Sequence, residues 1–148
     1  MTQREEVRFK VYTKATTSLV GGQVFPLELI DFNEGDGSYN TTTYTYTVQN
    51  AGTYLLGLSY NKRLFTNKGS TDIRIDRVVD GVSTTRTINR SQEVETGTYL
   101  TINPVIMYKL EVGDELYCLS NFGNPLTNLS SYISDDTLNS FWGIRLDY

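Results

Sequence analysis

Apolar and polar residues alternate along much of this chain with a period of two. Residues 43–48 alternate threonine with tyrosine or valine, and residues 53–60 carry tyrosine or leucine at every second position. Alternation of β-branched and aromatic residues predicts half-buried strands. The break at Ala51-Gly52 is short enough for a hairpin turn, so we expect these two strands to pair with each other.

The rest of the chain shows further short strands and no helical period. Pro26 limits its segment to a short or edge strand, Pro104 predicts a bulge or edge, and Asp80-Gly81 is a strong signal for a hairpin turn. Two polar segments, residues 61–70 and 121–139, are predicted as loops. The other predicted strands cover residues 7–13, 23–32, 71–80, 82–90, 98–110, 115–120 and 140–148. Short strands separated by glycine-rich turns indicate an all-β fold, a two-sheet antiparallel sandwich or jelly roll.

Composition limits the classes of function. With 148 residues, 39% hydrophobic and 20% charged, the chain is expected to form a single domain over residues 1–148, with a flexible N-terminus at residues 1–6. A net charge of −4 with scattered lysine and arginine argues against a nucleic-acid partner. No apolar run approaches the roughly 20 residues that a membrane span needs, so membrane insertion is not expected. The N-terminus has no signal-peptide pattern.

The chain has little catalytic chemistry. It contains no histidine and a single cysteine, Cys118, which excludes histidine-dependent triads and an internal disulfide. Cys118 lies in an apolar strand pattern and is expected to be a small buried residue. No nucleophile–base spacing and no glycine-rich phosphate loop is present, so we predict that the protein is not an enzyme.

The final segment, residues 140–148, is apolar on both faces except at Arg145 and Asp147. We therefore predict a central strand that needs a cover on each side, whereas a two-layer sandwich covers one side only. Arg145 should require a partner, either Asp147 or an acidic residue of a neighbouring subunit. Trp142 is expected in the core or in an interface. The residues that we expect to be largely buried are Tyr54, Leu56, Leu58, Leu110, Phe141 and Ile144.

The order of these features resembles the globular head domain of complement C1q, which shares the tumour-necrosis-factor jelly roll. The residues that carry the resemblance are Phe25 and Phe32, Asn33-Glu34-Gly35, Tyr39, Tyr46, Gly52-Thr53-Tyr54, Leu110 through Leu116 with its Gly113-Asp114 turn, and Phe141-Trp142-Gly143-Ile144. The match covers about residues 7–148. Residues 43–48 depart from the pattern, with tyrosine and threonine where the family usually has Gly-x-Phe, and no collagen-like stalk precedes the domain.

The resemblance implies a compact homotrimer whose strands pack around a threefold axis, and a function in binding. It makes four residues of the last strand candidates for the trimer interface or core: Phe141, Trp142, Ile144 and Arg145. A strand that is apolar on both faces needs a second cover, and a subunit interface would supply it. The apolar pattern of the last strand therefore agrees with the expected trimer.

Ligand binding is expected on loops, because loop side chains are not committed to the core. The segment 121–139 combines Phe122, Tyr132, Asp135 and Asp136 with many amide and hydroxyl groups, and these four residues are the predicted ligand site. Some members of the resembling family bind calcium near the trimer apex, and Asp135-Asp136 is the best carboxylate cluster here. A solvated turn is the favoured interpretation, so no cofactor is expected and the metal assignment stays open.

Three functions remain in competition. The first is a recognition head that binds a glycan or protein on a cell surface, either as a secreted C1q-like protein or as the head of a viral or phage fibre. The second is a structural trimerisation or virion-decoration protein. The third is a receptor-activating ligand of the tumour-necrosis-factor type. All three place the protein in the extracellular space or on a virion surface.

Overall fold

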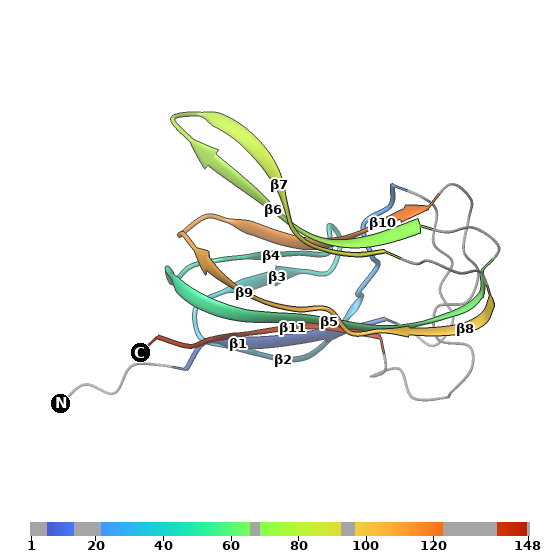
Figure 1. Cartoon of the computed structure of the whole chain (residues 1–148). Coiled ribbons are helices and arrows are strands. Elements are labelled where there is room, and N and C mark those ends of the chain that lie inside the picture. Colours follow the sequence, from blue (N-terminus) through green and yellow to red (C-terminus); the bar gives the residue numbers. More distant parts are fainter. Residues whose placement is uncertain (1–5, 14–21, 66–68, 93–96, 123–138, 148) are drawn as a thin grey trace.

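The computed structural model describes residues 6–13, 22–65, 69–92, 97–122 and 139–147. Within these ranges it describes the backbone alone for residues 60–65, 69, 92, 97–102 and 121–122. The described residues form eleven β-strands and no helix, and the strands make two antiparallel sheets that lie face to face (Figure 1). The predicted all-β, two-sheet antiparallel fold is confirmed.

The first sheet, called sheet A here, contains the first and last strands of the chain. Its order is β2-β1-β11-β5-β8. The strand β9 pairs with β5 as well, along a different part of β5 from the part that pairs with β8. The strands of sheet A are β1 (Arg8–Tyr12), β2 (Leu29–Glu34), β5 (Gly52–Phe65), β8 (Gly97–Ile102), β9 (Val105–Leu110) and β11 (Ser140–Arg145). The last strand therefore lies between β1 and β5, in the central position that its apolar sequence predicted.

The second sheet, sheet B, has the order β3-β4-β10-β6-β7. Its strands are β3 (Ser38–Asn40), β4 (Thr45–Thr47), β6 (Gly69–Val79), β7 (Val82–Gln92) and β10 (Glu115–Phe122). The turn at Asp80-Gly81 joins β6 to β7 as predicted, with positive φ angles of 52° and 78°. This is the geometry that a two-residue hairpin turn requires.

The predicted hairpin between residues 43–48 and 53–60 is wrong. The strand β4 pairs with β3 and β10 in sheet B, whereas β5 pairs with β11, β9 and β8 in sheet A. The residues between them carry the chain from one sheet to the other. Both runs alternate because each buries one face, Tyr46 from sheet B and Tyr54 from sheet A. Alternation shows which side chains are buried, and it does not show which strand is the neighbour.

Other boundaries also differ from the sequence expectation. Residues 61–65, predicted as loop, continue β5 and pair with β8. The predicted strand over residues 23–32 begins at Leu29, and before it Val24 makes an isolated bridge to Leu119. The run over residues 98–110, predicted as one strand with a bulge or edge at Pro104, is split at Asn103-Pro104 into the two strands β8 and β9.

An aromatic cluster joins the two sheets. The ring of Phe9 on β1 stacks on Tyr46 of β4 at a centroid distance of 3.9 Å, and it meets the edge of Phe141 at 5.3 Å. All three side chains are completely buried. Gly143 makes this packing possible, because a Cβ there would lie 2.5 Å from the Phe9 ring.

The predicted core is confirmed at five of six positions and wrong at one. Five residues lie in the buried cluster: Tyr54, Leu56, Leu58, Leu110 and Phe141. Ile144 is half-buried on the outer face of sheet A, because it follows Gly143 on a strand whose side chains alternate. Cys118 is fully buried as predicted, and burial raises the pKa of its thiol.

Truncation of Phe141 to alanine removes the centre of this cluster. We expect Phe141→Ala to lower the free energy of unfolding by about 3–5 kcal/mol, the usual cost of deleting a buried aromatic side chain. Urea unfolding followed by circular dichroism measures the change. A midpoint equal to that of the wild-type protein would contradict the position of β11 in the core.

Candidate functional site

The outer faces of the two sheets differ in chemistry. On sheet B, Asp72 is fully buried beneath two arginines, accepting hydrogen bonds from Arg90 Nε at 2.8 Å and Arg74 Nη2 at 3.1 Å. Burial raises the pKa of Asp72, but the hydrogen bonds from Arg90 and Arg74 outweigh it and hold that pKa below its usual value. Close by, Asp76 accepts hydrogen bonds from Tyr117 and Thr85. The charged and polar groups of this face satisfy one another.

Sheet A presents apolar side chains on its outer face. Two cross-strand rows follow from the pairing registers, the first running Phe32, Lys10, Trp142, Gly57, Val105 and the second running Glu34, Arg8, Ile144, Leu55, Met107. Met107 is 63% exposed and Val105 is 52% exposed. The centre and the β9 side of the face are therefore apolar, and charged residues stand on the β1–β2 side. We call this surface the sheet A face.

Trp142 occupies the middle of the sheet A face. Its indole lies on Gly57 of the adjacent strand β5, because a Cβ at Gly57 would overlap Cε2 and Cζ2 of the ring. A glycine within a strand often marks such a close approach. The only tryptophan of the chain is thus held against β5, and it is half-buried.

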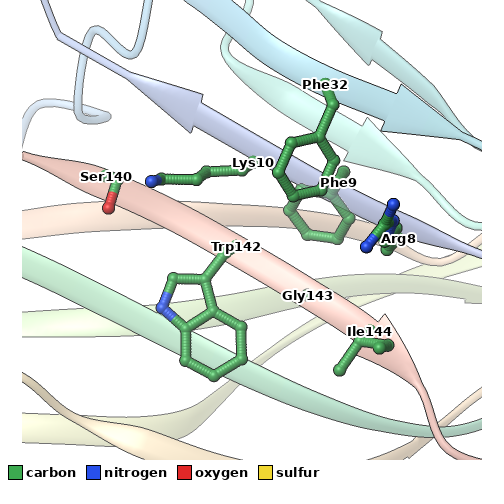
Figure 2. Close-up of a pocket in the computed structure, with 8 residues that line it drawn as sticks. All are labelled: Arg8, Phe9, Lys10, Phe32, Ser140, Trp142, Gly143 and Ile144. Carbon is green, nitrogen blue, oxygen red and sulfur yellow. The ribbon is translucent and has the colours of Figure 1, made fainter. Parts of the chain in front are cut away.

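A shallow groove of about 450 Å³ runs beside Trp142. Figure 2 shows Trp142 and Ile144 on β11, with Phe32, Lys10 and Arg8 toward β1 and β2. The guanidinium of Arg8 donates to Glu34 at 2.6 Å and lies 5.2 Å from the centre of the Phe32 ring. This hydrogen bond lowers the pKa of Glu34. The groove therefore has an apolar floor and a rim of paired charges.

Arg145 pairs with Asp147 of the same chain, which is one of the two partners that the sequence suggested. Its Nε lies 3.6 Å from the Asp147 carboxylate, and the arginine side chain is 17% exposed. Asp147 also accepts a hydrogen bond of 2.8 Å from the backbone N–H of Thr53. The pair fastens the end of the chain to β5, at the border of the sheet A face.

A second apolar surface lies at the tip of the β6–β7 hairpin. Figure 1 shows this hairpin standing away from the rest of the sandwich. Beside its Asp80-Gly81 turn, Val78, Val79 and Val82 are 65%, 56% and 62% exposed. Three neighbouring exposed valines on a projecting hairpin form an apolar contact point, which we call the valine tip.

Comparison with solved structures identifies the fold. Eiger TNF from S. frugiperda superposes with a TM-score of 0.77 at 10% sequence identity, over 97% of this chain and 94% of that one. Murine APRIL superposes with a TM-score of 0.70 at 14% identity, over 95% and 99% of the two chains. The chain has the jelly-roll fold of the tumour-necrosis-factor ligands. No protein-family model matches it, and no curated protein sequence matches it significantly.

The predicted ligand residues fall mostly outside the described part of the chain. Phe122 is the last residue of β10, where its backbone pairs with Gly69, and it belongs to a strand instead of the predicted loop. Tyr132, Asp135 and Asp136 lie outside the described residues. These four residues stay a prediction.

The carboxylate of the Gly113-Asp114 turn is engaged in hydrogen bonds within the chain. Asp114 is buried and receives two hydrogen bonds from Arg77, at 2.9 and 2.7 Å. Within the described residues, no group of three or more histidine, cysteine, aspartate or glutamate side chains is arranged to hold a metal ion. Nor does any helix in that part of the chain have the length and apolar character to span a bilayer.

Sequence reasoning found Trp142 but missed its surroundings. Leu55, Val105 and Met107 complete the apolar side of the face, and none was singled out from the sequence. A signal was present, because residues 105–108 carry apolar side chains at consecutive positions, as in a strand that is covered on both faces. The valine tip carries a similar signal, three valines around Asp80-Gly81.

A methyl group at Gly57 tests the position of the indole. Gly57→Ala should displace the Trp142 ring and destabilise the fold by about 1–3 kcal/mol, the usual cost of overpacking. The same substitution made in a Trp142→Ala background should cost much less, because the overlapping ring is absent. Urea unfolding of the four proteins gives the coupling. Equal costs in both backgrounds would contradict the contact.

Proposed function

We propose that this protein is a non-enzymatic, homotrimeric recognition head that binds a protein or glycan on a cell surface. The observation that carries the proposal is the apolar sheet A face, centred on Trp142 and extended by Met107 and Val105. Monomeric soluble proteins rarely expose a contiguous apolar surface of this kind unless it is an interaction site.

The contrast between the sheets argues that the sheet A face is covered by further copies of the chain. Sheet B already presents a polar face with paired charges, whereas the apolar side chains of sheet A have no cover within the described chain. Full burial of one large apolar side chain contributes about 1.5–3 kcal/mol. Burial of Met107 and of the parts of Trp142, Ile144 and Leu55 that are still exposed therefore offsets part of the cost of association, about 4–15 kcal/mol.

The number of copies rests on the resemblance. The C1q-like order of motifs implies a trimer, and the fold shared with Eiger TNF and APRIL supports an assembly of the same kind. Three copies would present each target-binding segment three times, so a weak site would gain avidity on a repetitive surface. An extracellular or virion-surface location follows from this function.

A receptor-activating ligand is the second candidate function. It is favoured by the structural similarity to two tumour-necrosis-factor ligands and by the valine tip, an apolar contact suited to a protein partner. Signalling by the purified protein through a receptor would support this function, and binding on a glycan array would support a sugar-binding head. Assembly without any target would indicate the third alternative, a structural trimerisation or virion-decoration protein.

Light scattering tests the assembly. The wild-type protein should have three times the monomer mass of 16.8 kDa at micromolar concentration. Met107→Glu places a charge in the sheet A face and should yield a folded monomer. The matched control is Val112→Glu, because Val112 is 62% exposed but lies in the turn between β9 and β10. A monomeric wild type, or dissociation by Val112→Glu as well, would overturn the proposed face.

The predicted target site has its own test. Phe122→Ala and Tyr132→Ala should weaken binding to the cells or glycans that the wild type recognises, with the trimer mass unchanged. Loss of the trimer in either variant would show that the residue is structural. No calcium requirement is expected, so a calcium-dependent rise in melting temperature that disappears in Asp135→Asn/Asp136→Asn would correct this part of the proposal.

A further inference from the structure

A small recess lies between the β6–β7 hairpin and β9, away from the sheet A face. It is lined by Ile75, Arg77, Thr84, Arg86 and Tyr108, and its volume is about 30 Å³. A single water needs roughly 10–15 Å³ on this measure, so the recess admits about two waters or one small planar group.

Arg77 forms a fixed wall of the recess. It donates from Nε and Nη2 to the two oxygens of the buried Asp114, at 2.9 and 2.7 Å. Asp114 is itself held by the backbone N–H of Glu111 at 2.7 Å. Donation of these hydrogen bonds to the Asp114 carboxylate raises the pKa of Arg77. Arg77 is therefore rigid and already neutralised, and its Nη1 takes no part in these bonds.

Arg86 brings a positive charge that no described carboxylate neutralises. It stands on β7 opposite Ile75 and is exposed. No carboxylate in the described part of the chain forms an ion pair with it, in contrast to Arg74, Arg77 and Arg90. The recess thus combines one guanidinium that has no ion pair among the described residues with one that is held in place, and it has the Tyr108 ring at its side.

The same side of the hairpin becomes apolar toward its tip. The pairs across β6 and β7 on this side are Ile75 with Arg86, Arg77 with Thr84, and Val79 with Val82. Because strand side chains alternate, these pairs share one face. A group bound in the recess would therefore have two exposed valines as its next neighbours.

We propose that this recess binds a carboxylate side chain of a protein partner, in a segment where apolar residues flank the acid. A carboxylate is planar and accepts two parallel hydrogen bonds from a guanidinium, which suits both the volume and Arg86. Val79 and Val82 favour aliphatic neighbours over a hydroxyl-rich sugar. The inference rests on the proposed recognition function and names the chemistry of its partner.

Nuclear magnetic resonance of the arginine side chains tests the site directly. Two synthetic pentapeptides serve as probes, one with a leucine-aspartate-leucine core and one with asparagine in place of the aspartate. The aspartate peptide should shift the Nε–Hε signals of Arg86 and Arg77, and the asparagine peptide should not. Shifts of equal size with both peptides, or no shift at about 10 mM, well above a Kd of 1 mM, would overturn the proposal.

Two variants on the same strand sharpen the test. Arg86→Gln should weaken binding of the aspartate peptide about tenfold, the scale of one charge-assisted contact. Arg90→Gln is the control, because Arg90 lies on the opposite face beside Asp72, which keeps Arg74 as a partner. An equal loss in both variants would show a general effect of charge and would contradict a site in the recess.

A third probe, sodium glucuronate, distinguishes a sugar acid from a protein acid. Shifts of Arg86 at lower concentration with glucuronate than with the aspartate peptide would overturn the protein partner. Failure of this inference is separable from failure of the proposed function. A trimer that binds cells but shows no Arg86 response contradicts the recess alone, whereas a monomeric protein contradicts the recognition head.

Discussion

The structure depends on the fact that β11 lies between two neighbours and is apolar on both sides. Phe141 and Gly143 face inward, where Phe9 packs across them onto Tyr46 of the other sheet. Trp142 and Ile144 must then face outward, because side chains alternate along a strand. A two-layer sandwich covers only one of these faces. The core and the exposed apolar surface are thus two consequences of one strand.

The other surfaces of the molecule differ from the apolar sheet A face in their chemistry. The outer face of sheet B carries charged groups that are already paired, as at Asp72 with its two arginines, and it needs no further cover. The β6–β7 hairpin extends from sheet B and carries the valine tip and the Arg86 recess. If the sheet A face is closed by self-association, the hairpin stays available to a target. Assembly and recognition are then assigned to opposite layers of the sandwich.

The sequence predicted burial better than pairing. Strict alternation identified Tyr54, Leu56 and Leu58 as inward residues, and the doubly apolar last segment was correctly expected at the centre of a sheet. The hairpin between residues 43–48 and 53–60 was wrong, because the chain crosses from sheet B to sheet A between β4 and β5. Met107 went unnoticed since its exposure depends on register with Leu55, a contact between strands about fifty residues apart.

Fluorescence of Trp142, the single tryptophan of the chain, tests the central claim most directly. If copies of the chain cover the sheet A face, the emission of Trp142 at micromolar concentration will be blue-shifted and protected from acrylamide. Both properties will be lost on dilution to the monomer, while circular dichroism stays unchanged. A red-shifted, freely quenched tryptophan at every concentration would show that the face is open to water, and would contradict the account.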